Sequence, residues 1–343
     1  MLGYILKRLL LMIPTLLGAL TITFVVIQFV PGGPVETLMA EARAGQGESS
    51  GYKAGRDSDA KQIAELKKLY GFDKPAHVRY VEMIGNFLRF DLGKSFLQNK
   101  DVWSLIKEKL PVSISLGLWT FVLSYLISVP LGVWKAVREG SRFDVLSSLV
   151  VLIGYAIPGF VLGLFLIVLF AGGSFYELFP LRGLTSDNWA DLSWPARITD
   201  YLWHITLPLI CMVIGSFAIV TMLTKNTFVE EMRKQYVLVA RAKGLSQKRV
   251  LFKHIFRNAL IPLITGFPSA FIGAFFAGSV LIETLFSLDG LGLLSYESVV
   301  RRDYPVVLGS LYLFTLIGLV VKLVSDLLYV VVDPRVQFTS VGK

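Results

Sequence analysis

Six apolar runs divide the chain, and polar segments of very different lengths separate them. A transmembrane helix needs about 20 predominantly apolar residues, and each run has roughly that length. The pattern therefore predicts an all-α membrane protein with six transmembrane helices, at 9–30, 112–134, 145–170, 205–224, 259–282 and 306–332.

The first run follows Lys7 and Arg8, as the apolar core of a signal peptide would. It is longer than the usual core of about 7–15 residues, and Pro31-Gly32-Gly33-Pro34 follows it in place of a small-residue cleavage site. We therefore expect a retained membrane anchor.

Charge is scarce and unevenly distributed. Only 17% of the residues are charged, against about 25% in soluble domains, and the formal net charge of +9 could suggest nucleic acid as a partner. If the N-terminus is cytoplasmic, the inner pieces 1–8, 135–144, 225–258 and 333–343 hold 16 basic and 5 acidic residues, whereas the outer pieces hold 17 and 19. This asymmetry is a topology signal. It places both termini in the cytoplasm and argues against nucleic acid.

The predicted organisation is a membrane domain with one insertion. It comprises a tail and first helix at 1–30, an extracytoplasmic segment at 31–111, a five-helix core at 112–332 with a cytoplasmic loop at 225–258, and a cytoplasmic tail at 333–343. Within the extracytoplasmic segment, the polar stretch 41–59 predicts a mobile loop, and the apolar spacing in 60–72 predicts a short helix.

The sequence offers little for catalysis or metal binding. Gly93-Lys94-Ser95 resembles the end of a phosphate-binding loop, but position 88, where that loop needs Gly, is Leu. Cys211 is the only cysteine, so we expect a small packing residue rather than a disulfide. The three histidines lack the spacing of metal ligands: His77, His204 and His254. We therefore predict no catalytic, cofactor or metal site.

Ionisable residues avoid the middle of the predicted spans. Lys322 and Asp326 fall near the inner end of the last span, and Glu283 lies at the outer end of the fifth. A stand-alone carrier driven by protons or sodium normally needs a charged group near the midplane. Its absence disfavours that class.

Small residues and prolines recur within the spans. Gly159 with Gly163, Gly273 with Ala277, and Ala274 with Gly278 have the spacing of close helix contacts, either within this chain or with a partner subunit. Prolines that can bend the helices are Pro130, Pro158 and Pro208.

The loop between the fourth and fifth spans contains a basic stretch. Residues 236–262 include six Lys or Arg and no acid. Residues 230–243 favour a helix, Gly244 can end it in a left-handed conformation, and Ser246 can cap a second helix. Val237, Ala240 and Gly244 share one face, where small residues would let another protein dock. A basic loop resting on lipid headgroups is the alternative.

This stretch resembles the cytoplasmic signature of binding-protein-dependent ABC importer permeases, in which Glu-Ala-Ala precedes a Gly and a later Ile-x-Leu-Pro. Ala240-Arg241-Ala242 occupies the Glu-Ala-Ala positions and Gly244 the glycine. His254, Phe256 and Arg257 stand where Ile, Leu and Pro are expected, so the chain departs from the general pattern. ARAKGLS followed by KHIFRNALIP instead resembles the dipeptide/oligopeptide/nickel branch.

The resemblance extends over nearly the whole chain. LPVSISLGLW, IETLFSLDGLGLL and RRDYPVV are similar to segments of that branch. HITLP and GGSFYELFPLRGL are similar to the Yej-type subgroup, which is associated with peptides and microcin C.

The resemblance implies one half of a peptide pore in the bacterial inner membrane. Its partners would be a second homologous permease, one fused or two separate cytoplasmic ATPases, a periplasmic peptide-binding protein and the lipid bilayer. The ATPase-coupling residues would be Tyr236, Val237, Ala240, Arg241, Ala242, Lys243, Gly244, Leu245 and Ser246. Loop-anchoring residues would be His254, Arg257 and Asn258. Alternatives are a permease for nickel chelate or another small solute and, from a different class, a secondary carrier or a membrane enzyme.

Overall fold

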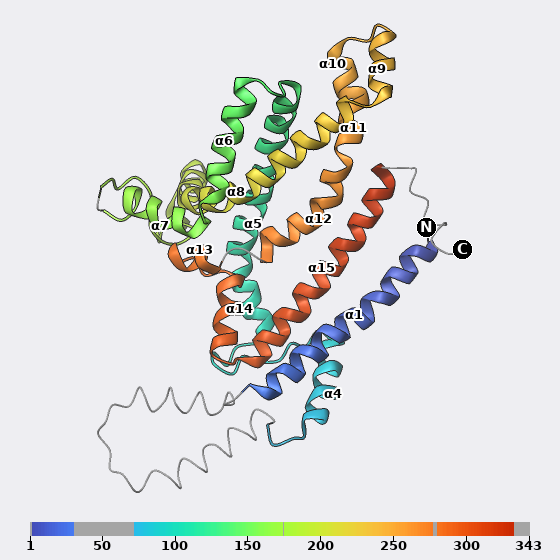
Figure 1. Ribbon diagram of the computed structural model, residues 1–343. Coiled ribbons are helices and arrows are strands. Elements are labelled where there is room, and N and C mark those ends of the chain that lie inside the picture. The colour runs from blue at the N-terminus through green and yellow to red at the C-terminus, as the bar shows by residue number, and fades with distance from the viewer. Residues whose placement is uncertain (1, 31–71, 174, 277–279, 333–343) are drawn as a thin grey trace. The chain divides into compact units, whose positions relative to one another are not determined.

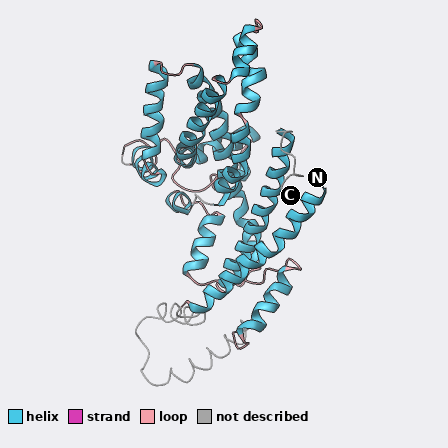
Figure 2. Cartoon of the chain, turned by 45° about the vertical axis from the view of Figure 1, so that its right-hand side comes forward, coloured by secondary structure: helices cyan, strands magenta, loops and turns pink. Residues whose placement is uncertain are grey.

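In the computed structural model, helices account for all regular secondary structure of the described residues, 2–30, 72–173, 175–276 and 280–332. Figure 2 shows these helices and the loops that join them. The prediction of an all-α protein is confirmed for this part of the chain. The described residues belong to two units, one within 1–110 and 294–319 and the other within 111–293 and 320–343.

Four described helices are long and apolar enough to cross a membrane, and they overlap the first, second, fourth and sixth predicted spans. Figure 1 labels them: α1 (Leu2–Phe29), α5 (Val102–Val137), α8 (Trp194–Met232) and α15 (Tyr304–Val332). With 36 and 39 residues, α5 and α8 are longer than the predicted runs. Hydropathy detects only the apolar part of a helix, so it misses polar turns at either end.

The third predicted span is not one straight helix. It consists of α6 (Arg142–Ala156) and α7 (Gly159–Phe170), which are bent by 91° at the break between them. The residue before a proline is pushed out of the helical region, and Ile157, which precedes Pro158, is extended with ψ of 118°. In contrast, α5 and α8 continue through Pro130 and Pro208.

The fifth predicted span is also interrupted. Its described parts are α11 (Phe256–Ala259), α12 (Ile261–Phe276) and α13 (Val280–Leu285). Ala277 and Gly278, which belong to the predicted small-residue pairs, lie outside the described residues. If α6 and α7 count as one span, the described helices provide five.

The remaining helices are short. They are α4 (Ala76–Phe87), η1 (Trp189–Asp191), α9 (Gln235–Ala242), α10 (Gln247–Arg249), the π-helical η2 (Val250–Ile255) and α14 (Leu291–Val300).

Gly159 and Gly163 pack inside this chain. A Cβ atom at Gly159 would lie 2.7 Å from the carbonyl oxygen of Cys211 in α8, and one at Gly163 would lie 3.5 Å from the Cys211 sulfur. Cys211 is itself buried, as expected for a packing residue. The four-residue spacing therefore serves the close crossing of α7 on α8.

Glu283 joins α13 to the start of α14. Its side chain is fully buried, and its Oε2 accepts a 2.7 Å hydrogen bond from the backbone N–H of Leu293. A Cβ at Gly290 would lie 2.6 Å from Oε1, so glycine leaves the space that the carboxylate fills. A carboxylate near a helix N-terminus is stabilised by the helix dipole. The predicted charge at the end of this span is thus a structural cap.

The first unit contains the described part of the predicted insertion. There, Ser95 donates a 2.5 Å hydrogen bond to Oδ2 of Asp303, and the backbone N–H of Phe96 donates a 3.0 Å bond to Oδ1. These bonds tie the loop after α4 to the turn before α15. The predicted mobile loop at 41–59 and most of the predicted helix at 60–72 lie outside the described residues.

Candidate functional site

The predicted coupling stretch forms a helical hairpin, here called the basic hairpin (residues 235–259). It consists of α9, a turn at 243–246, and a second arm made of α10, η2 and α11. Figure 1 shows α9 and α10 side by side beyond the end of α8. The arrangement of a short helix, a turn and a second helix is therefore present, but the first helix is shorter than predicted: residues 230–232 belong to α8, and α9 begins only at Gln235.

Gly244 terminates α9 in the predicted left-handed conformation, with φ of 77°. Its N–H donates to the carbonyl of Arg241 at 2.9 Å, and the N–H of Leu245 donates to the carbonyl of Ala240 at 3.4 Å. These two bonds define a Schellman motif, which satisfies carbonyls at the end of the helix. Glycine adopts this conformation without the penalty that a Cβ atom brings.

The second arm departs from the prediction in two respects. Ser246 has the extended backbone of an N-cap residue, but its side chain makes no capping hydrogen bond. The arm is also not uniformly α-helical, because Val250–Ile255 forms a π-helix. π-Helical turns often occur at functional sites.

Val237 and Ala240 face the interior of this chain, so their interpretation as an exposed docking face is wrong. Their exposed fractions are 0% and 7%. They lie in one apolar cluster with residues of α5, α8, η2 and α11, here called the hairpin core: Ala136, Phe228, Val237, Ala240, Val250, Ile255 and Ala259. The small residues let α9 approach its own second arm and the ends of α5 and α8.

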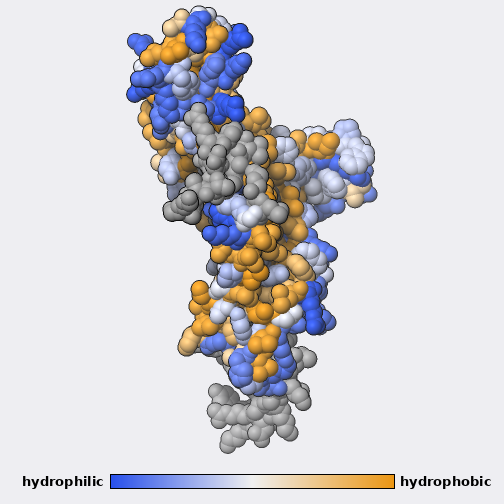
Figure 3. All heavy atoms as spheres, turned by 90° about the vertical axis from the view of Figure 1, so that its right-hand side faces the viewer, coloured by the Kyte–Doolittle hydropathy of each residue, from blue (hydrophilic) through white to orange (hydrophobic). Residues whose placement is uncertain are grey.

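The exposed face of α9 is instead formed by its other side. Leu238 and Val239 are 60% and 52% exposed, and Arg241, Ala242 and Lys243 are exposed beside them. In Figure 3, the lobe that contains α9 and α10 shows apolar patches between hydrophilic ones. Exposed apolar residues that gather on one surface are typical of interaction sites.

Tyr236 anchors α9 to α8 and to the second arm. Its hydroxyl donates a 2.6 Å hydrogen bond to Oε2 of Glu231 and lies 3.5 Å from the backbone oxygen of His254. Burial, followed by the bond to Glu231, raises the Tyr236 pKa to about 12, although a hydrogen bond with Asn258 opposes the shift. The phenol therefore remains a donor at neutral pH.

The three predicted anchoring residues differ in their contacts. Asn258 bonds to Tyr236 through its side chain, and His254 contributes its backbone carbonyl. Arg257 is exposed, and within the described residues we find no ion pair for it. The direct side-chain anchor is therefore Asn258.

A buried charge cluster near the hairpin core was missed by sequence reasoning; we call it the charge triad (Lys135, Asp144 and Lys225). Lys135 is fully buried, with Nζ 3.3 Å from Oδ1 of Asp144. Lys225 Nζ lies 2.7 Å from Oδ2 of the same carboxylate. The triad joins α5, α6 and α8.

Neutral oxygens complete the surroundings of Lys135. Its ammonium donates to the backbone oxygen of Asp144 at 2.9 Å and to the hydroxyls of Ser147 and Ser148 at 2.7 and 2.8 Å. In the sequence, Lys135 and Asp144 enter only the charge count of the piece 135–144. The only available signal was their position at the ends of two neighbouring apolar runs.

A second, exposed ion pair connects the same elements. Arg233, directly after α8, lies 2.9 Å from Glu139 in the turn between α5 and α6. The elements that carry the hairpin core are thus tied together by apolar packing, a buried charge cluster and a surface pair. Among the described residues, no group of three or more His, Cys, Asp or Glu could hold a metal ion.

Comparison with known proteins places this architecture in a transporter family. Residues 128–338 match the family model described as binding-protein-dependent transport system inner membrane component. The chain is 54% identical to a peptidoglycan transport system permease protein, YejB, from Agrobacterium fabrum, with 98% of each chain covered.

Two further relatives agree. The chain is 53% identical to the inner membrane ABC transporter permease protein YejB of Escherichia coli O157:H7, covering 98% of this chain and 99% of the relative. It is 34% identical to the oligopeptide transport system permease protein AppB of Bacillus subtilis, covering 98% and 100%. This chain is a multi-pass inner-membrane permease that belongs to the binding-protein-dependent transport system inner membrane component family.

Proposed function

We propose that this chain forms half of the translocation pore of an ATP-driven importer for oligopeptides. A second, homologous permease would supply the other half, a cytoplasmic ATPase the energy, and a periplasmic binding protein the peptide. The names of the relatives support peptides over nickel chelate as the substrate.

The proposed topology has six spans with both termini in the cytoplasm. The α6–α7 pair would form the third span, and the chain from α11 to α13 the fifth. The excess of Lys and Arg in the pieces assigned to the inside supports this orientation. The organisation into a first helix at 1–30, an outer segment at 31–111, a core at 112–332 and a tail at 333–343 is part of the same proposal.

The exposed face of α9 is the proposed ATPase-docking surface. One observation carries this: the helix presents Leu238, Val239 and Ala242 to solvent while its opposite side is packed in the hairpin core. A helix buried on both sides could not receive a partner. A helix resting loosely on lipid would not need a buried side.

Force applied to α9 has a defined route into the membrane helices. The hairpin core contacts α5 through Ala136 and α8 through Phe228. The charge triad adds α6, because Asp144 bonds to Lys135 of α5 and to Lys225 of α8. ATPase closure would therefore move the ends of three helices together.

Introducing a charge on the docking surface tests this assignment. Ala242→Glu leaves the hairpin core untouched and should abolish ATP-dependent peptide uptake by the reconstituted importer, because it buries a carboxylate against the ATPase. Gln247→Glu, which is also exposed but lies on α10, is the matched control and should retain uptake. Equal uptake by both variants would favour the lipid-resting alternative.

The Agrobacterium relative is named a peptidoglycan transport permease, and this name favours a second substrate class, peptidoglycan fragments. Competition between an ordinary labelled tripeptide and a murein tripeptide in the uptake assay separates the two. Stronger competition by the murein peptide would narrow the proposal to wall-derived peptides. Uptake of neither would refute peptide transport.

A further inference from the structure

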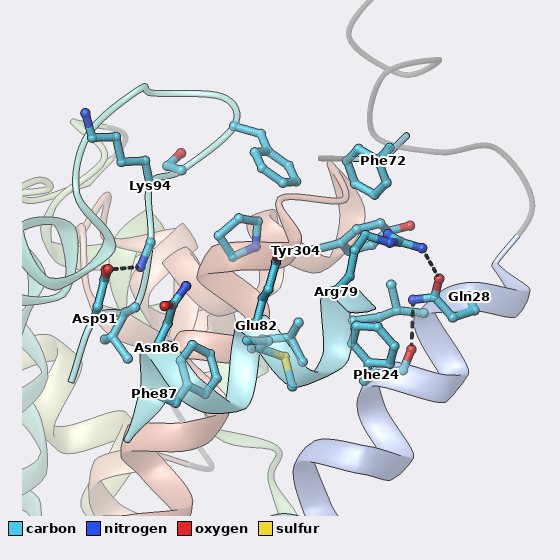
Figure 4. Close-up of a pocket in the computed structure, with 18 of the residues that line it drawn as sticks. Phe24, Gln28, Phe72, Arg79, Glu82, Asn86, Phe87, Asp91, Lys94 and Tyr304 are labelled. Atoms are coloured by element: carbon cyan, nitrogen blue, oxygen red, sulfur yellow. Dashed lines mark hydrogen bonds between the residues drawn. The ribbon is translucent and has the colours of Figure 1, made fainter. Parts of the chain in front are cut away.

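The first unit contains a pocket of about 590 Å³. Figure 4 shows that residues of α1, α4, the loop after α4 and the start of α15 line it. Small-molecule sites commonly measure roughly 300–1,000 Å³. The volume therefore suits a ligand of two to four amino acids better than a single ion.

Aromatic rings form much of the wall. They are Phe24, Phe72, Phe87, Phe96 and Tyr304. Phe72 and Phe96 meet edge to face, with ring centroids 5.7 Å apart. Such a wall can bury apolar side chains of many shapes.

The charged residues of the lining are balanced, with Arg79 and Lys94 against Glu82 and Asp91. They are also separated along the pocket: Figure 4 shows Arg79 with Gln28 at one end, Asp91 and Lys94 at the other, and Glu82 between them. A site for an anionic lipid or a phosphate would show an excess of cations. Separated charges of both signs fit a zwitterion.

Arg79 is positioned to receive a carboxylate. Its Nη2 donates a 2.6 Å hydrogen bond to Oε1 of Gln28, and its guanidinium lies 5.0 Å from the ring centroid of Phe72. Its Nε is buried and meets no hydrogen-bond acceptor within the described part of the chain. A buried donor without an acceptor is unfavourable, and a bidentate carboxylate is the natural partner of a guanidinium edge.

The acidic side chains retain acceptors for an ammonium group. Glu82 accepts a 2.7 Å bond from Lys74 through Oε1, and Asp91 accepts a 3.0 Å bond from the N–H of Gly93 through Oδ1. The second oxygen of each carboxylate makes neither of these bonds. Both residues lie on the Lys94 side of Arg79 in Figure 4.

We propose that this pocket binds a short zwitterionic peptide, with its C-terminal carboxylate on Arg79, its N-terminal ammonium at Glu82 or Asp91, and its side chains against the aromatic wall. The inference rests on the proposed peptide transport and adds a peptide site on the permease itself. Peptide recognition would then not belong to the binding protein alone.

The test uses the assembled importer in nanodiscs without its binding protein and a tripeptide that carries a photoreactive phenylalanine. We expect cross-links to the fragment around Phe72 or Phe96. C-terminal amidation should weaken binding about tenfold, because it removes a charge-assisted bond. Arg79→Gln should weaken the free-acid peptide similarly, whereas Arg89→Gln, which is exposed and outside the pocket, should not.

The inference is overturned if the native protein binds the amidated peptide as tightly as the free acid, or if cross-links form only outside the pocket. Weaker docking of the binding protein to Arg79→Gln, with unchanged peptide binding, would assign the pocket to that protein instead. Peptide uptake is measured in parallel with the binding protein present. If uptake occurs without cross-links in the pocket, this inference alone fails; if the native importer takes up no peptide, the proposed function fails.

Discussion

Removing the central carboxylate of the charge triad should destabilise the ends of α5, α6 and α8 that the triad joins. In Asp144→Asn, Lys135 would remain fully buried beside Lys225 with no negative charge between them. Breaking a buried pair from one side costs about 3–5 kcal/mol. Three neutral oxygens still surround the Lys135 ammonium, so we expect the lower end, about 3 kcal/mol.

The exposed pair provides the matched control. Arg233 and Glu139 are 71% and 43% exposed, and surface pairs contribute at most about 1 kcal/mol. Glu139→Gln should therefore have a small effect. Replacing all three members of the triad with apolar residues, Lys135→Met, Asp144→Leu and Lys225→Met, should recover most of the stability, because apolar residues of similar size can replace a buried ionic cluster.

Hydrogen exchange of the backbone amides at 140–148, measured in the assembled importer, reports this local stability. Asp144→Asn should accelerate exchange far more than Glu139→Gln, and it should lower peptide uptake per ATP hydrolysed. If the two single variants exchange alike, the triad is not a buried structural element. If exchange accelerates but uptake per ATP is unchanged, the proposed route of force through α6 is wrong.

Two other predictions concern glycines. Gly244→Ala should destabilise the end of α9 by about 1 kcal/mol, because alanine resists the left-handed conformation, and the backbone amides of α9 should then exchange about fivefold faster. Gly244→Asn should have a milder effect. Equal exchange rates in the native protein and both variants would contradict the role of Gly244 as the helix cap. Gly159→Val should lower the thermal stability of the importer, because the added Cβ would lie 2.7 Å from a carbonyl of α8. Gly85→Val is the control for replacing a helical glycine by valine, because a Cβ at Gly85 would meet open space. If both variants lower the thermal stability equally, the α7–α8 crossing is not tight.

Hydropathy predicted the helices whose apolar runs are uninterrupted, but it could not predict where an apolar run bends into two helices. Averaged hydropathy gives 145–170 as one run. In the structure, Pro158 holds the preceding residue, Ile157, out of the helical conformation, and α7 is bent by 91° relative to α6. Proline alone does not decide this, because α8 continues through Pro208.

In the basic hairpin, the backbone conformation could be predicted from the sequence, but the packing partner of each helix face could not. The turn at Gly244 follows from backbone sterics alone, and it was predicted correctly. Helical spacing placed Val237 and Ala240 on one face, but small residues suit either close internal packing or close docking. The structure has them inside. Lys135 could not be recognised as buried, because its acceptors come from α6 and are only brought near by folding.

Docking of the ATPase on the exposed face of α9 can be tested directly by cross-linking. With Cys211 replaced by alanine, a cysteine at Ala242 would be the only one in the chain, and a cysteine at Arg142, which is exposed at the start of α6, is the control. Disulfide cross-linking to single cysteines placed across the ATPase surface then maps the contact in the assembled importer. If the ATPase docks on α9, position 242 should form a rapid cross-link that is sensitive to ATP, and position 142 should form none. Cross-linking from 142 but not from 242 would contradict docking on α9.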